Sequence, residues 1–398
     1  MKIAVVGLGA IGSQVLWQLS MQPGVEAHGY ETHYPGHQTA GAGGGSRLFW
    51  NVELSEPKYA PIIVRAGEAW RRLEAAAGMP LRASTGALVF GQADSEQMAQ
   101  ALASAELTNA EIEALDHERL VERFPQFSFH PNDIGLWDVA GAAIKPELTV
   151  ATAARLAEQN GATIHRFSPV TGVELEDRGG VVLTSDGVAR YDRIVVAAGG
   201  WTPKLLPYLR SEVVARRLTS AWYFAEHPGA LEGLPPFMQS APSYSYGLPS
   251  SDGFSVKVGF GFNDHYVTGD PDALPRELKG EELEQQVERF GRLRDGLLPG
   301  LAPLPYRVNT YVESYTRSML EHVQHHPESK DLVVLTGFSG HGFRAAPAIG
   351  EIGAELILHG ESSTDVSFLA EAPPAFEVLD PETGEASYNP VMSSYGSR

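Results

Sequence analysis

The stretch that decides the fold is Lys2–Ser13, with the sequence KIAVVGLGAIGS. Its β-branched run, Ile3–Val6, is typical of a buried parallel strand, and a helical pattern follows the last glycine. The glycines have G-x-G-x-x-G spacing. Gly7 permits a tight turn, Gly9 lets backbone approach a pyrophosphate, and Gly12 lets the helix pack on the strand. Strand, glycine turn and helix in this order predict a dinucleotide-binding fold.

An acidic residue completes this fingerprint. A second strand is expected over Val25–Tyr30, and Glu31 follows it, 19 residues after Gly12. A carboxylate in that place accepts hydrogen bonds from the ribose diol of a dinucleotide. The N-terminus of the helix expected over Ser13–Ser20 adds free N–H groups and the positive end of a dipole, which favour phosphate.

The amino-acid composition limits the classes of binding partner that we expect. The chain has 398 residues, 43% of them hydrophobic, which is enough for two domains. Its 49 acidic and 30 basic residues give a formal net charge of −19, so we expect neither nucleic acid nor an anionic membrane as a partner. Cysteine is absent, which excludes disulfides, thiolate metal sites and a cysteine-linked cofactor. No metal site is predicted.

Targeting segments are not recognisable in the sequence. The first strand begins at residue 2 without a preceding signal peptide, and no run approaches the roughly 18 apolar residues of a membrane span. We therefore expect a cytoplasmic protein that is a monomer or a small homo-oligomer.

Further glycine-rich segments follow later strands. Arg193–Ala198 leads into Gly199-Gly-Trp201, and Asp331–Thr336 leads into Gly337-Phe-Ser-Gly-His-Gly-Phe343 and a helix. Strand, glycine loop and helix indicate backbone that meets a ligand.

An earlier glycine-rich run, residues 41–46, is either a flexible linker or a loop that covers a phosphate or ring. The firm helical pattern after it favours the loop.

The rest of the chain is predicted to form a second layer, apart from the nucleotide-binding fold. From Ala215 the pattern changes to β-rich segments with aromatic residues, which favours an antiparallel sheet that carries a substrate site. Before it, Asn109–Phe124 is predicted to be helical. The fold class is therefore α/β, with a Rossmann-like domain and an α+β second domain.

Together these motifs resemble the FAD-dependent amine oxidases of the D-amino-acid-oxidase superfamily, of the monomeric sarcosine oxidase and N-methyltryptophan oxidase type. The resemblance covers most of the length. It rests on Gly7–Gly12 with Glu31, Gly45-Ser-Arg47, Ala198-Gly-Gly-Trp201, Tyr246-Gly-Leu-Pro249, Lys257-Val-Gly259 and Gly337–Phe343.

The resemblance implies two interleaved domains. Residues 1–84, 145–212 and 328–375 would form the FAD-binding domain. Residues 85–144 and 213–327 would form the substrate domain, and residues 376–398 an irregular tail. The cofactor-binding residues that it implies are Gly7, Gly9, Ala10, Ile11, Gly12, Glu31, Ser46, Arg47, Val170, Gly199, Trp201, Gly340, His341, Gly342 and Phe343.

The resemblance also assigns roles near the substrate. Lys257 matches a catalytic lysine beside the flavin that promotes reaction with O2; the alternative is a solvated strand lysine. Arg344 matches a lysine that meets the substrate carboxylate, and an arginine keeps that charge. Tyr246 and Trp50 are expected to contact the substrate.

Several positions depart from the family pattern. Glu313 stands where the enzymes of this type attach FAD to a cysteine, so we expect non-covalent FAD, although a histidyl bond stays open. Trp50 replaces a carboxylate-binding arginine, and Gly261 replaces a histidine. A substrate bulkier than sarcosine is therefore expected.

The implied activity is oxidation of a secondary amine, an N-alkyl or N-methyl amino acid, with hydride transfer to flavin N5, imine hydrolysis and reduction of O2 to hydrogen peroxide. Three alternatives stay open: a flavin dehydrogenase that passes electrons to a carrier, a NAD-dependent dehydrogenase, and a flavin-binding subunit without catalysis of its own. The loop Gly337–Phe343 argues against the NAD-dependent enzyme.

Overall fold

The computed structural model describes residues 1–54, 56–240, 244–250, 253–260 and 270–369, and the backbone of 266–268, 378–380 and 385–386. Gly261 lies outside the described residues. So does the predicted tail 376–398, apart from two short paired strands, β22 (Val378–Asp380) and β23 (Glu385–Ala386).

One sheet is mostly parallel and contains the first strand of the chain. Its order is β20-β21-β13-β1-β2-β9, and the β20–β21 pair is antiparallel. The strands are β1 (Lys2–Val6), β2 (Glu26–Tyr30), β9 (Thr163–His165), β13 (Arg193–Val196), β20 (His322–His326) and β21 (Ser329–Thr336).

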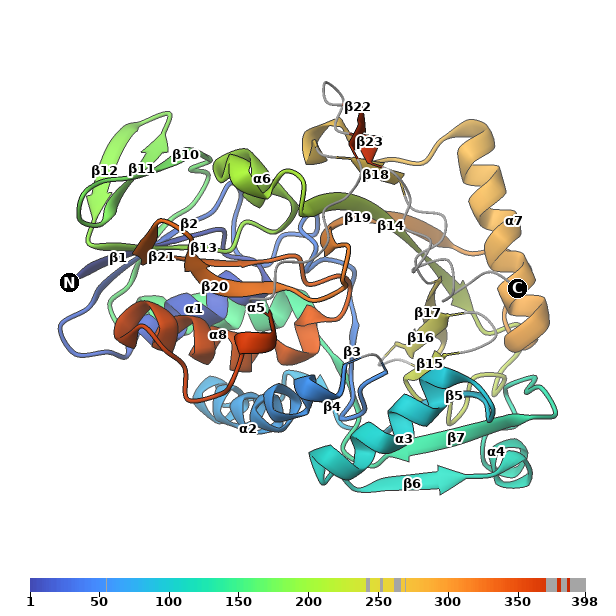
Figure 1. Ribbon diagram of the computed structural model, residues 1–398. Coiled ribbons are helices and arrows are strands. Elements are labelled where there is room, and N and C mark those ends of the chain that lie inside the picture. Colours follow the sequence, from blue (N-terminus) through green and yellow to red (C-terminus); the bar gives the residue numbers. More distant parts are fainter. Residues whose placement is uncertain are drawn as a thin grey trace.

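Alternating residues of β1 explain how both faces of this sheet are covered. Ile3 and Val5 pack into a core with helices α1 (Ala10–Ser20), α2 (Ala60–Ala77), α5 (Pro146–Gln159) and α8 (Gly342–His359), which lie below the sheet in Figure 1. Ala4 and Val6 pack on the opposite face against a small antiparallel sheet of β10 (Val170–Leu175), β11 (Gly180–Thr184) and β12 (Gly187–Tyr191). A strand buried on both faces needs apolar side chains at every position, as the sequence shows.

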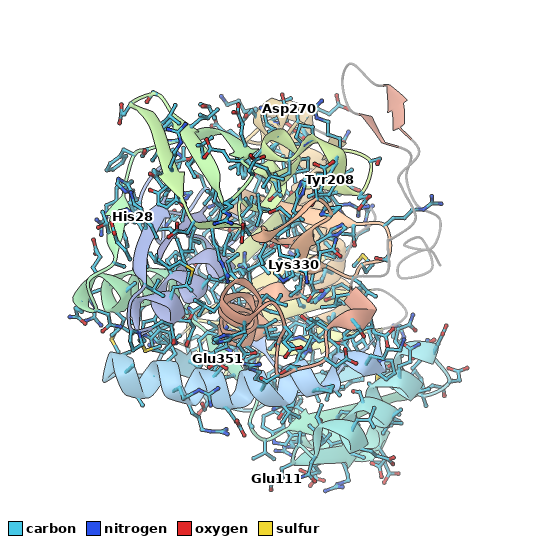
Figure 2. All side chains as sticks on the ribbon, turned by 60° about the vertical axis from the view of Figure 1, so that its left-hand side comes forward. His28, Glu111, Tyr208, Asp270, Lys330 and Glu351 are labelled. Carbon is cyan, nitrogen blue, oxygen red and sulfur yellow. The ribbon has the colours of Figure 1, made fainter. Side chains whose placement is uncertain are left out.

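Helix α2 is held to α8 by ion pairs as well as by apolar contacts. Glu351 of α8 lies beside α2, where it accepts hydrogen bonds from Arg65 at 2.9 Å and from Arg72 at 2.8 Å (Figure 2).

The second sheet is mostly antiparallel and lies on the right in Figure 1. Its order is β18-β14-β17-β16-β15-β5-β7-β6, β19 also pairs with β14, and the β15–β5 pair is parallel. The elements of this half are β5 (Ala87–Gln92), α3 (Glu96–Thr108), β6 (Ile112–Leu115), α4 (His117–Arg123), β7 (Asp133–Asp138), β14 (Val213–Phe224), β15 (Phe237–Gln239), β16 (Ser245–Pro249), β17 (Ser255–Phe260), β18 (Tyr266–Thr268), α7 (Gly280–Leu297) and β19 (Arg307–Thr316).

The two sheets alternate along the chain, which confirms the predicted interleaved α/β architecture. The predicted domain bounds stay a prediction. Strand β20 precedes the predicted boundary at 328 but belongs to the parallel sheet. A small sheet of β3 (Arg47–Phe49), β8 (Ala142–Ile144) and β4 (Arg82–Ala83) joins segments that were assigned to different domains.

The predicted helix over Asn109–Phe124 is wrong in its first half. Asn109 adopts a left-handed conformation that ends α3, and β6 then pairs with β7. The helix begins only after Asp116, whose side chain accepts a hydrogen bond from the Arg119 backbone N–H at 2.9 Å. An N-cap of this kind fixes a helix start locally.

Substitutions in the glycine turn after β1 test how closely this turn is packed. A Cβ on Gly12 would lie 1.9 Å from the Gly7 carbonyl oxygen, whereas one on Gly9 meets no described atom within 4 Å. We expect Gly12→Ala to lower the unfolding free energy of the apoprotein by about 1–3 kcal/mol, as overpacking does. Gly9→Ala is the matched control and should change it much less. Equal urea midpoints for the two variants would contradict this packing.

Candidate active site

The main cavity of the described structure lies at the carboxyl edge of the parallel sheet and has a volume of about 650 Å³. Val6, Val196 and Val334 are aligned across β1, β13 and β21, so the turns that follow these strands converge at one edge. Ligands of open parallel sheets bind outside this edge.

The glycine turn presents bare backbone to the cavity. Gly7 has φ +86°, and a Cβ there would lie 2.7 Å from the Ala197 carbonyl oxygen, so the turn fits tightly between two strand ends. Gly9 lines the cavity with open space where a side chain would be. Gly7 thus makes a tight turn, and Gly9 leaves bare backbone at the cavity wall.

Glu31 is a buried acceptor at the end of β2. Its Oε2 accepts a hydrogen bond from the Leu8 N–H at 3.0 Å, its Oε1 accepts one from the His33 N–H at 3.1 Å, and His37 Nε2 lies 3.3 Å from Oε1. Burial opposes ionisation, but the bonds from His37 and the backbone bring the pKa of Glu31 below its ordinary value. The side chain lines the cavity as a carboxylate.

The glycine-rich loop before β3 is anchored at several points. Glu147 of α5 accepts hydrogen bonds from the backbone N–H groups of Gly44 at 2.8 Å and Gly45 at 2.9 Å. Arg47 donates to the carbonyls of Gly41 at 2.7 Å and Ser46 at 2.9 Å. These contacts favour the cavity loop over the flexible linker.

Lys257 is not a solvated strand lysine. It lies on β17, is 3% exposed, and its Nζ donates to the Ser46 carbonyl at 3.1 Å. The rings of Trp222 and Tyr311 lie 5.7 and 5.5 Å from Nζ. Burial, and secondarily the charge of Arg47, lowers the pKa of Lys257 well below its ordinary value.

Glu313 and Arg47 face each other across the cavity wall. Arg47 Nη2 lies 3.6 Å from Glu313 Oε1, and both residues line the cavity. Burial raises the pKa of Glu313 above its ordinary value, although the charges of Arg47 and Lys257 act in the opposite direction.

Arg344 is paired inside the protein. Its Nη2 donates to Glu53 Oε2, and its Nη1 donates to the Val52 carbonyl at 2.7 Å. The guanidinium lies 5.3 Å from the centre of the Trp50 ring. Arg344 and Glu53 are both buried.

His341, at the start of α8, is also partnered by a carboxylate. Its Nε2 lies 3.0 Å from Glu321 Oε2, and Tyr59 donates from its hydroxyl to Glu321 Oε1 at 2.6 Å. Burial and the charge of Glu321 raise the pKa of Tyr59 well above its ordinary value, so this hydroxyl stays a donor.

Trp50 and Tyr246, the two aromatic residues predicted to contact the substrate, lie in different surroundings. Trp50 is 6% exposed and packs in an apolar cluster with Val89 and Met238, while its Nε1 has no hydrogen-bond partner among the described residues. Tyr246 packs over Gly259, and its hydroxyl lies 3.2 Å from Ser220 Oγ.

Most predicted cofactor-binding residues line the cavity, namely Gly7, Gly9, Ala10, Ile11, Glu31, Arg47, Val170, Gly199, Trp201, Gly340, Gly342 and Phe343. Gly12, Ser46 and His341 are not among its lining residues. Their roles stay predictions. Sequence reasoning missed Glu53, Glu147, Glu321 and Tyr59, because no motif marks them.

Comparison with protein families matches residues 2–356 to DAO, described as FAD dependent oxidoreductase. The chain belongs to this family.

Curated relatives in the DAO family match over nearly the whole length. A monomeric sarcosine oxidase of Streptomyces avermitilis is 28% identical over 387 residues, 93% of this chain and 98% of the relative. An N-methyl-L-tryptophan oxidase of Salmonella arizonae is 27% identical over 369 residues, 92% of this chain and 96% of the relative. The chain is an FAD-dependent oxidoreductase of the sarcosine-oxidase type.

Solved structures share the fold. NikD, described as an unusual amino acid oxidase essential for nikkomycin biosynthesis, has a TM-score of 0.79 at 23% identity, over 94% of this chain and 97% of that chain. The L-proline dehydrogenase from P. horikoshii has a TM-score of 0.75 at 20% identity, over 92% and 96%.

The cavity fits the cofactor of the DAO family. Backbone at Gly9 is bare, Glu31 is a carboxylate positioned to accept from hydroxyl groups, and the loops at Gly199 and Gly340 line the same space. Within the part of the chain that the structure describes, no helix is long and apolar enough to cross a membrane.

Proposed function

We propose that the chain oxidises a secondary amine of the N-alkyl or N-methyl class and uses O2 as the electron acceptor. The names of the curated relatives, oxidases of sarcosine and of N-methyl-L-tryptophan, support this class. When bound, FAD supplies the acceptor for the hydride of the amine and then the electrons that reduce O2 to hydrogen peroxide, while water hydrolyses the imine product.

The buried Lys257 is the observation that carries the proposal. Its Nζ is fixed by the Ser46 carbonyl, directly beside Arg47 of the cavity wall. An ammonium group in a site poor in water stabilises negative charge as O2 is reduced. Lys257 is therefore proposed as the catalytic residue for the reaction with O2. No protein acid or base is required if the amine binds without its extra proton.

Trp50 and Tyr246 are proposed to limit the substrate. Trp50 is a large side chain at a position where the resemblance places an arginine, and Tyr246 is held by packing over Gly259. Rigid aromatic surfaces favour an amine with apolar or aromatic arms. Whether that amine carries a carboxylate depends on Arg344, whose terminal nitrogens are already occupied.

The direct test uses protein loaded with FAD. A panel of secondary amines mixed without oxygen should bleach the flavin band near roughly 450 nm, and admitted air should restore it with one hydrogen peroxide per amine oxidised. Bleaching that only an artificial electron acceptor reverses would support a dehydrogenase and contradict the oxidase. No bleaching by any secondary amine would contradict the substrate class.

FAD is proposed to be held without a covalent bond. The chain has no cysteine, and Glu313 occupies the position where the resemblance expects one. Acid precipitation should therefore release the flavin into the supernatant. A precipitate that stays yellow after washing would mean a bond to another side chain.

Lys257 gives a prediction for pH. Because its pKa is lowered, the side chain loses its proton below the ordinary lysine value of about 10.4, and reoxidation by O2 should slow as the pH rises through that lowered pKa. Lys257→Arg keeps the charge and should remove this pH dependence. Lys257→Met should slow reoxidation by about 100-fold, the scale for one electrostatic donor, and leave anaerobic reduction nearly unchanged.

Stopped-flow measurement of the two half-reactions checks this prediction. Equal slowing of both half-reactions in Lys257→Met would remove the role in O2 reduction and leave a structural one.

A further inference from the structure

We propose that the substrate of this oxidase is a secondary amine without a carboxylate, because the basic groups that would receive a carboxylate are already paired with buried acidic side chains. This inference rests on the proposed amine oxidase function and specifies its substrate class. It replaces the predicted role of Arg344 as a carboxylate ligand.

The guanidinium of Arg344 is already held by two acceptors. Recognition of a carboxylate by arginine uses two parallel N–H groups of the guanidinium fork. Here Nη1 and Nη2 donate to the Val52 carbonyl and to Glu53. Nε has no partner among the described residues, and each terminal nitrogen keeps one further N–H, but both terminal nitrogens are already held by buried acceptors.

Glu53 is fixed in place by two further hydrogen bonds. Its Oε1 accepts a hydrogen bond from the Leu54 N–H at 2.9 Å, and its own backbone N–H donates to Ser104 Oγ of α3 at 2.7 Å. Glu53 therefore cannot turn away easily to release Arg344. Displacing it would leave a buried carboxylate without its cation, which is strongly unfavourable.

Charge repulsion also disfavours a carboxylate at Arg344. A substrate carboxylate at Arg344 would be the second carboxylate on one cation, next to Glu53 in a buried site. Two like charges in such a site disfavour each other's ionised forms. The site would have to bind the acid protonated or reject it.

Two other basic side chains of the described region also face carboxylates. Arg47 faces Glu313 at 3.6 Å, and His341 faces Glu321 at 3.0 Å. Lys257 is 3% exposed, and its Nζ already donates to the Ser46 carbonyl. The undescribed segments 241–243, 251–252 and 261–265 contain neither lysine nor arginine.

The side chains that remain are suited to an uncharged substrate body. Trp50 has a buried ring, and its Nε1–H, which has no partner among the described residues, can donate to a neutral acceptor. At both positions where the resemblance expects a cation for the carboxylate, the chain thus has either an aromatic ring or a paired arginine.

The test compares matched substrates in the loaded protein: N-methyltryptamine with N-methyltryptophan, and N-methylphenethylamine with N-methylphenylalanine. The rate constant for anaerobic flavin bleaching, divided by the apparent dissociation constant, should be at least about tenfold higher for each amine than for its matched amino acid. A preference for the amino acids in the wild-type protein would overturn the inference.

Variants of Glu53 and Arg344 test whether their ion pair causes the preference for amines without a carboxylate. Glu53→Gln releases Arg344 from its ion pair. It should reduce the preference for the amine over the matched amino acid by at least about tenfold. The double variant Glu53→Gln/Arg344→Gln is the matched control and should not show this reduction. An unchanged preference in Glu53→Gln would overturn the explanation.

A binding measurement separates this inference from the proposed function. Titration with phenylacetate, followed by the flavin spectrum, should show at least about tenfold tighter binding to Glu53→Gln than to the wild-type protein. Equal binding to both would overturn the inference even if no amine is turned over. The expected difference together with no bleaching by any amine would instead sink the oxidase proposal.

Discussion

The parallel register of β1, β13 and β21 is the constraint on which the cavity depends. Because Val6, Val196 and Val334 are level with one another, each glycine turn begins at the same edge of the sheet. The close fit of Gly7 against Ala197 shows how little space separates these turns. The register thus gathers motifs that lie more than 300 residues apart in the sequence into one binding wall.

Pairs of opposite charge are the second feature of this organisation, and Glu53, Glu321 and Arg344 within them are buried. Arg47 with Glu313, Arg344 with Glu53, and His341 with Glu321 place three acidic side chains against three basic ones around one region. Pairing of this kind avoids isolated charges in a low-dielectric interior. It also means that a basic residue recognised in the sequence need not be available to a ligand.

Sequence patterns predicted the glycine turns, Glu31 and the two interleaved sheets, because glycine chemistry and strand periodicity are local properties. The pairing of Arg344 with Glu53 joins residues 291 positions apart, and that of Tyr59 with Glu321 joins residues 262 positions apart, so no local pattern marks either. The wrong helix over Asn109–Phe124 has a local cause: the N-cap at Asp116 and the left-handed Asn109 were not recognised. Lys257 donates to the Ser46 carbonyl, which lies 211 positions earlier in the sequence, so no local pattern marks its surroundings.

The most direct measurement of the central claim is hydrogen–deuterium exchange of the apoprotein with and without FAD. We expect slower exchange on FAD binding in 7–12, 31–37, 41–47, 197–201 and 337–343 together, because these segments share the cavity wall. Saturating FAD that slows exchange in none of the three glycine turns, or only in other parts of the chain, would contradict the convergence of these turns on the cofactor.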